Sequence, residues 1–248
     1  VNRGTRKARE ILRDYKKYNL TTTVEFSMEG SEEKAWPLGM ARPHLDENDR
    51  MAGGKRDMVW LPRYDEDFEE KVYTLFCEFG WPGGPINGTM LWNEPWEGKS
   101  ISGWQADMIR YREIYTHMAR AAERAAEDAG VEVLIGGCDS GPNTMDKLFP
   151  DTSREFLTWL DFMSIHYQGD FVTPLKTFRD RDHPHVRTQI WDTESWITNT
   201  EDGVPSMVAG CVSFGYDRIV GIFGYGGTSV KMSATDSRTD KRVEGEKA

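Results

Sequence analysis

Two glutamates stand where acid–base chemistry would need them, each just after a short run typical of a buried strand. Glu94 follows the run 88–92, and Glu194 follows the run 188–191. Trp96 and Trp196 lie two residues beyond them, and an aromatic face packs well against the apolar side of a sugar ring. Cleavage of a glycosidic bond needs one carboxylic acid to protonate the leaving oxygen and one carboxylate to attack the anomeric carbon. The pair therefore indicates carbohydrate chemistry.

Other ionisable residues also follow strand-like runs. His166 and Tyr167 end one such run, and only one of them should point into a site because side chains alternate along a strand. Asp192 precedes Glu194 by two residues, which places both on one face of a regular extended segment. Asp192 is therefore a second candidate for the nucleophile, or a partner that tunes it.

Three tryptophans and one tyrosine are candidate sugar platforms. Tyr225 follows the last strand-like run, and Trp36 joins Trp96 and Trp196 as an aromatic residue outside the predicted strands. Trp36 belongs to the segment 28–63, which is rich in Gly, Pro, Asp and Glu and is expected to form one wall of a cleft.

The elements that must position these residues alternate along the chain. Residue periodicity predicts strands at 21–26, 88–92, 131–135, 162–167, 188–191 and 218–223. Helices are expected at 4–18, 65–79, 104–128, 153–160, 173–179 and 206–214. Asp65 is expected as the N-cap of the second helix, Ile109 on the inward face of the third, and Gly130 at the end of the third.

Strands that alternate with helices, without hairpin signals, predict an α/β fold with a parallel sheet. Two architectures compete, an open doubly wound sheet and a closed (β/α)8 TIM barrel. In a barrel the carboxyl ends of all strands meet on one face, where active sites are built. An open sheet would spread the strand-end residues along an edge, with one crevice at its switch point. The number of ionisable groups at successive strand ends favours the barrel.

Two segments resemble a known family. The segment 92–95, Trp-Asn-Glu-Pro, resembles the Asn-Glu-Pro signature after the fourth strand of clan A glycoside hydrolases, which are retaining enzymes on (β/α)8 barrels. The segment 192–196, Asp-Thr-Glu-Ser-Trp, resembles the nucleophile segment after their seventh strand. The resemblance implies Glu94 as general acid/base and Glu194 as nucleophile. It also implies a β-type linkage in the substrate and no cofactor.

The same resemblance assigns further roles. It implies that Asn93 hydrogen-bonds the sugar 2-hydroxyl, and that His166 and Tyr167 occupy the sixth-strand position close to the nucleophile. Tyr225 stands where the clan often has a tryptophan after the eighth strand. On this strand count the segment 21–26 is the third strand, so the first two strands are missing. We therefore expect residues 1–230 to form a partial barrel with strands three to eight, and residues 231–248 to form a polar tail or linker.

Composition narrows the classes of function. The net charge of −10, from 31 basic and 41 acidic residues, is unfavourable for nucleic-acid binding, which needs a basic face. No apolar run approaches the roughly 20 residues that a membrane span requires. Three cysteines without a CxxC spacing, and the absence of an HExxH pattern, indicate no metal site. The expected partner is an oligo- or polysaccharide. Oligomeric state and compartment stay open, with an extracellular or periplasmic location slightly favoured.

Three alternatives share these residues. A barrel could bind carbohydrate without cleaving it, or hydrolyse a substrate with a metal held by His166, Glu94 and Asp192. A transglycosylase would differ only in whether a sugar or water resolves the intermediate. The glycan, the linkage, and endo or exo action are not determined by the sequence.

Overall fold

The computed structural model describes residues 3–26, 62–92, 108–137, 159–166, 188–198, 203–220, 222–225, 235–236 and 241–242. The chain divides into two compact units. Unit 1 comprises residues 1–137 and 147–161, and unit 2 comprises residues 138–146 and 162–248. The predicted helix at 173–179, most of the one at 153–160 and nearly all of the segment 28–63 lie outside the described residues.

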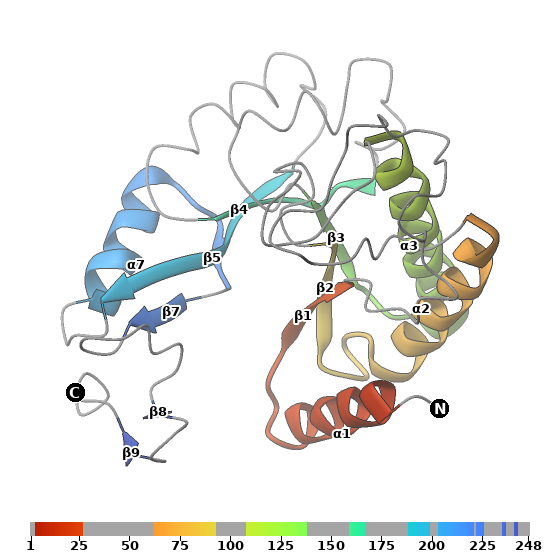
Figure 1. Ribbon diagram of the computed structural model, residues 1–248, viewed down its shortest axis with the longest axis horizontal. Helices are drawn as coiled ribbons and strands as arrows, with labels where there is room; N and C mark the ends of the chain where they lie inside the picture. Colours follow the sequence, from red (N-terminus) through yellow and green to blue (C-terminus); the bar gives the residue numbers. More distant parts are fainter. Residues whose placement is uncertain are drawn as a thin grey trace, which may run out of the picture. The chain divides into compact units, whose positions relative to one another are not determined.

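Unit 1 begins with α1 (Arg3–Lys17), β1 (Thr22–Phe26), the 3-10 turn η2 (Pro62–Tyr64) and α2 (Asp65–Phe79). It continues with β2 (Ile86–Leu91), α3 (Met108–Ala129) and β3 (Leu134–Gly137). Figure 1 shows α2 and α3 packed side by side. The ends of two helices have the charges that the helix dipole favours, with three acidic residues in the first turn of α2 and two lysines in the last turn of α1.

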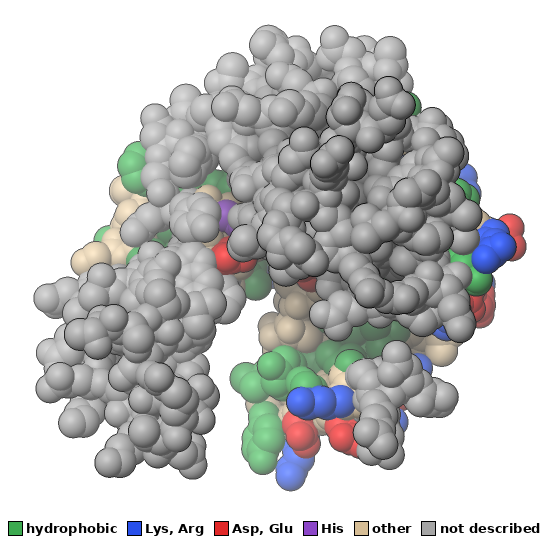
Figure 2. All heavy atoms as spheres, in the orientation of Figure 1, with side chains coloured by type: hydrophobic (Ala, Val, Ile, Leu, Met, Phe, Trp, Pro, Cys, Tyr) green, Lys and Arg blue, Asp and Glu red, His purple; other side chains and the backbone are tan. Residues whose placement is uncertain are grey.

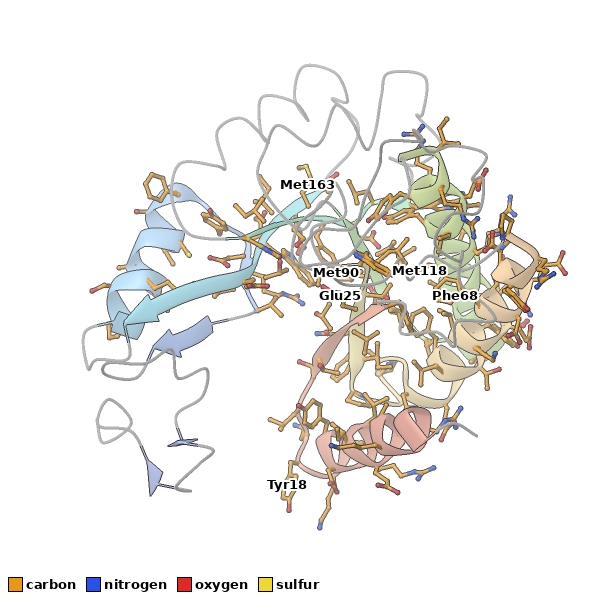
Figure 3. The ribbon with its side chains drawn as sticks, viewed as in Figure 1. Tyr18, Glu25, Phe68, Met90, Met118 and Met163 are labelled. Atoms are coloured by element: carbon orange, nitrogen blue, oxygen red, sulfur yellow. The ribbon has the colours of Figure 1, made fainter. Side chains whose placement is uncertain are left out.

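The three strands of unit 1 form a parallel sheet in the order β1-β2-β3. Helix-facing residues of the strands supply the core: Phe26 of β1 meets Phe68 of α2 edge-on, with ring centroids 5.6 Å apart. Figure 3 shows Phe68 projecting from α2 and Met118 from α3, and the sulfur of Met118 lies 3.6 Å from the Thr89 hydroxyl of β2. This sheet and these helices confirm the α/β expectation for the first half of the chain.

Two details of unit 1 differ from the sequence-based expectations. Ile109 is not inward on α3, since 47% of its surface is exposed, whereas Ile114 is fully buried. The buried face of α3 therefore includes Ile114 and excludes Ile109. Gly130 does end α3, with a φ of 65° that glycine adopts without steric cost.

Asp65 is the first residue of α2 and not its N-cap, a position that Tyr64 occupies. Its carboxylate instead accepts two hydrogen bonds from Arg110 of α3, both at 2.6 Å, and both side chains are buried. Several other ion pairs of unit 1 lie at the surface, where Figure 2 shows acidic and basic side chains near each other. Arg9 and Arg13 of α1, for example, pair with Glu78 of α2.

Unit 2 contains β4 (Phe162–His166), β5 (Gln189–Thr198), α7 (Gly203–Phe214), β6 (Arg218–Ile219) and β7 (Ile222–Tyr225). β4 pairs with β5, and β6 and β7 pair with β5 on its other edge, all in parallel. Figure 1 shows α7 lying along β5. The short antiparallel strands β8 (Thr235–Asp236) and β9 (Lys241–Arg242) form a separate pair within the predicted tail, where no hairpin was expected.

The predicted last strand, 218–223, is two short strands that share one register against β5. Arg218 pairs with Trp191, and Ile222 pairs with Ser195, so both pieces keep the same offset. The interruption lies opposite residues 193 and 194 of β5. β5 is also much longer than the predicted strand 188–191. Each unit is thus an α/β assembly of parallel strands, consistent with part of a TIM-like barrel.

Candidate active site

The candidate site of unit 2 lies where β4 ends beside the middle of β5. The two strands pair residue by residue from Phe162 with Gln189 to Ile165 with Asp192, and His166 then pairs with Glu194. Thr193 is therefore an extra residue on β5, which makes the site a β-bulge. Bulges interrupt the ladder and re-aim side chains, and they are frequent beside active sites.

One face of this strand pair, here called the Trp191 face, is defined by Phe162, Ser164 and His166 of β4 and by Trp191, Thr193 and Glu194 of β5. The rings of Phe162 and Trp191 stack with centroids 3.7 Å apart. The guanidinium of Arg218, from β6, lies 4.2 Å from the Trp191 ring centroid. The Phe162–Trp191 stack and the Arg218 guanidinium pack together on this face, before the bulge.

His166 and Glu194 lie together at the end of the Trp191 face. Nδ1 of His166 is 3.8 Å from Oε2 of Glu194, which is an ion-pair distance when the imidazole is protonated and too long for a direct hydrogen bond. The His166 side chain is 3% exposed and that of Glu194 is 24% exposed. A partly exposed carboxylate beside a buried imidazole is accessible to a substrate.

Asp192 lies on the opposite face of β5, directed toward α7. It pairs with Ile165, which alternation places on the face opposite to His166. Its side chain is fully buried, and its Oδ2 accepts a hydrogen bond from Sγ of Cys211 at 3.4 Å. Burial and the nearby Asp192 carboxylate raise the pKa of the Cys211 thiol to about 12. The expectation that Asp192 shares a face with Glu194 is therefore wrong, because the extra residue breaks the alternation between them.

Thr193 and Ser164 are site residues that the sequence interpretation missed. The hydroxyls of Ser164 and Thr193 hydrogen-bond each other, and the Thr193 hydroxyl also donates to the carbonyl oxygen of Ile165 at 3.3 Å. No sequence signal distinguishes these two residues from other strand hydroxyls, because the bulge depends on the register between two strands.

The end of β2, in unit 1, lies just before Glu94 in the chain. Trp92 has a φ of 63°, rare for a bulky residue, and its side chain is buried. Its amide donates to the carbonyl of Phe26 at 2.9 Å, and the Tyr111 hydroxyl donates to the carbonyl of Leu91 at 3.0 Å. These bonds fix the direction in which the chain leaves β2, immediately before Asn93.

Some of the remaining predicted site residues lie within the described ranges, and others do not. Trp36, Asn93, Glu94, Trp96 and Tyr167 lie outside the described residues. Trp196 pairs with Phe223, and Tyr225 pairs with Thr198, through their backbones, and their side chains are not described. Glu25, an acidic residue of β1, lies opposite Met90 of β2.

The described residues contain neither a metal-binding cluster nor a helix that could span a membrane. Within these ranges no group of three His, Cys, Asp or Glu side chains could hold a metal ion. None of the helices described for this chain combines the length and apolar character needed to cross a membrane.

The chain has only distant similarity to known proteins. No family model matches it, and no curated protein matches it at a significant level. Among solved structures, it is similar to a glucosidase from Croceicoccus marinus, with 18% sequence identity and a TM-score of 0.47. The match covers 73% of this chain and 41% of that protein, so this chain spans about two fifths of the glucosidase's length.

Proposed function

We propose that the protein is a retaining glycoside hydrolase that cleaves β-type glycosidic bonds, with Glu194 as nucleophile and Glu94 as general acid/base. Glu194 attacks the anomeric carbon while Glu94 gives its proton to the leaving oxygen, so the glycosidic bond breaks and a glycosyl–Glu194 ester forms. Glu94 then removes a proton from water, which attacks the same carbon and releases Glu194. The net change is consumption of one water molecule, with the configuration retained.

The observation that carries the proposal is the placement of Glu194. It is the partly exposed carboxylate at the end of the Trp191 face, beside the buried His166 at 3.8 Å. A nucleophile must be accessible to the anomeric carbon, and the partly exposed Glu194 carboxylate meets this condition. The motif after β2, with Asn93 before Glu94, supplies the complementary acid in the proposal.

The buried position of Asp192 argues against two competing roles. Its carboxylate is engaged with Cys211 on the face toward α7, so it is poorly placed to replace Glu194 as nucleophile. It also lies on the opposite face from His166, which removes one ligand from the metal site considered for His166, Glu94 and Asp192. The proposal therefore assigns Asp192 to the packing of α7.

Sugar contacts in the proposal come from residues near the two glutamates. Asn93 would donate to the sugar 2-hydroxyl, and aromatic faces would carry the rings of the glycan. The aromatic candidates are Trp36, Trp96, Tyr167, Trp196 and Tyr225. No cofactor enters this chemistry.

Azide rescue tests both carboxylate roles on an aryl β-glycoside with a good leaving group. Glu194→Ala should lower turnover by about 10⁴-fold or more, and azide should restore it by attacking from the vacated side. The product should be the α-glycosyl azide. In Glu94→Ala, azide should replace the water and give the β-glycosyl azide. The matched control is Asp192→Asn, which should keep the nucleophile and form no α-azide.

Other outcomes would replace the proposal. If Glu194→Ala keeps full activity and Asp192→Ala yields the α-azide, then the nucleophile is Asp192. Binding of β-glycans without cleavage by the wild type would favour a carbohydrate-binding barrel. Loss of wild-type activity to a chelator would favour a metal-dependent hydrolase. Transfer products in place of hydrolysis at high glycan concentration would identify a transglycosylase.

A further inference from the structure

The bulge at Thr193 decides which way Glu194 points. In a regular strand, residues 192 and 194 lie on one face, because the side-chain period of a strand is two residues. Here Ile165 pairs with Asp192 and His166 pairs with Glu194, so β5 uses one more residue than β4 over the same step. Asp192 consequently contacts Cys211 of α7, whereas Glu194 contacts His166.

On the other edge of β5, β6 ends and β7 begins near the same place, and the Val220 amide donates to the Asp192 carbonyl at 2.7 Å. β6 ends with Ile219 opposite Asp192, and β7 begins with Ile222 opposite Ser195. Residues 193 and 194 therefore lie between the two paired stretches on that edge. Where the register between two strands shifts, side-chain hydrogen bonds can help to hold the local conformation.

The Thr193 hydroxyl supplies such bonds. It hydrogen-bonds the Ser164 hydroxyl and donates to the carbonyl of Ile165, both on the neighbouring strand. These contacts tie the extra residue to β4 immediately before the His166–Glu194 pair. A β-branched side chain also restricts its own χ1, which further limits the local conformations.

We propose that Thr193 is a positioning residue whose hydroxyl, bound to Ser164 and to the Ile165 carbonyl, locks the bulge that turns Glu194 toward His166 and away from Asp192. The inference rests on the proposed function for its kinetic consequence. The structural part of the inference, that Thr193 is coupled to the His166–Glu194 contact, does not depend on the proposed function.

The kinetic test compares Thr193→Val, which removes the hydroxyl and keeps the shape, with Thr193→Ser, which keeps the hydroxyl. Thr193→Val should lower kcat on an aryl β-glycoside by about 10–100-fold, because small displacements of a nucleophile cost rates of that order. KM should change by less than about threefold, and Thr193→Ser should recover most of kcat. Thr116→Val is the matched control, since this half-buried threonine also donates to a backbone carbonyl, that of Arg112, in unit 1. It should leave kcat unchanged.

A second readout is independent of activity. The NMR resonances of the His166 imidazole should shift when Glu194→Gln is introduced into the wild type. The same change introduced into Thr193→Val should shift them much less, and introduced into Thr193→Ser it should shift them as in the wild type. Ser164→Ala is the second variant, in case Thr193→Val does not fold, and it should weaken the coupling in the same direction.

Turnover and the His166 resonances together distinguish a failure of the proposed function from a failure of the positioning role of Thr193. If Glu194→Gln retains turnover but its effect on His166 disappears in Thr193→Val, the proposed function fails and the positioning role stands. An undiminished effect on His166 in both Thr193→Val and Ser164→Ala overturns the positioning role. A kcat loss that Thr193→Ser does not recover, or that Thr116→Val reproduces, overturns it as well.

Discussion

Asp192 and Cys211 are joined across the interface between β5 and α7, with Sγ 3.4 Å from Oδ2 and both side chains fully buried. This contact commits the Asp192 carboxylate to the helix side of β5. It also keeps the thiol protonated, because a thiolate there would be buried next to a carboxylate. The pKa of Cys211 is raised to about 12 for these reasons.

Cys211 should resist alkylation in the folded protein. At pH 8, far below a pKa of about 12, almost no thiolate is present, and the side chain is out of contact with solvent. Cys77, which is only half-buried, should react faster with iodoacetamide. Peptide mass spectrometry of timed samples measures both rates. Equal labelling of the two cysteines before unfolding would contradict this expectation.

Stability should fall at alkaline pH because of the same thiol. The unfolded chain releases the Cys211 proton near its ordinary pKa of 9.0, whereas the folded state holds it to about 12. Between these values the unfolded state binds fewer protons, so the free energy of unfolding decreases as pH rises, by at most about 1.4 kcal/mol per pH unit. Urea unfolding from pH 8 to 11 should show a steeper decline for the wild type than for Cys211→Ala. Parallel curves would exclude the linkage.

Asp65 should behave as half of a buried ion pair and not as a helix cap. Asp65→Ala removes one carboxylate partner of the buried Arg110, which keeps its ion pair with Glu113 at 3.1 Å, so the loss of unfolding free energy should be at most about 3–5 kcal/mol. Loss of an N-cap alone would cost about 1 kcal/mol. Lys71→Ala, which breaks the exposed pair with Asp67 on α2, is the control and should cost a few tenths of a kcal/mol. The free energy of unfolding of Asp65→Ala, measured by chemical denaturation, distinguishes loss of a buried ion pair from loss of a helix cap.

Asp161 and Asp217 each stand immediately before a strand, and each makes the same two hydrogen bonds to an isoleucine backbone. Asp217 donates its amide to the carbonyl of Ile190 at 2.8 Å and accepts the Ile190 amide on Oδ2 at 2.7 Å. Asp161 does the same with Ile135, at 2.8 Å for both bonds. Substituting either aspartate by Ala should cost about 1 kcal/mol, because the isoleucine amide loses its acceptor.

The corresponding Asn variants test whether the acceptor oxygen is what matters. Asn keeps an oxygen at the same place and should lose clearly less stability than Ala at both positions. Urea titrations of the four variants give the comparison. Equal losses for Asn and Ala would mean that the carboxylate charge, and not the hydrogen bond to the isoleucine amide, stabilises these strand starts.

Much of the fold could be predicted from the sequence because helix and strand periodicities are local. The helix predicted at 65–79 has those bounds as α2, and the strand predicted at 162–167 differs from β4 by one residue. All five residues of β4 are buried in the structure, as is typical of a strand covered on both faces.

The relations between distant elements could be read only from the folded chain. Local patterns predict that carboxylates follow strands, and regular alternation predicts that Asp192 and Glu194 share one face. Only the pairing of β5 with β4 revealed the extra residue at Thr193, which separates those two carboxylates. Likewise, only the packing of α2 on α3 brought Asp65 to Arg110, 45 residues away in the chain. Register and ion pairing depend on contacts between distant segments, and a pattern within one segment carries no information about them.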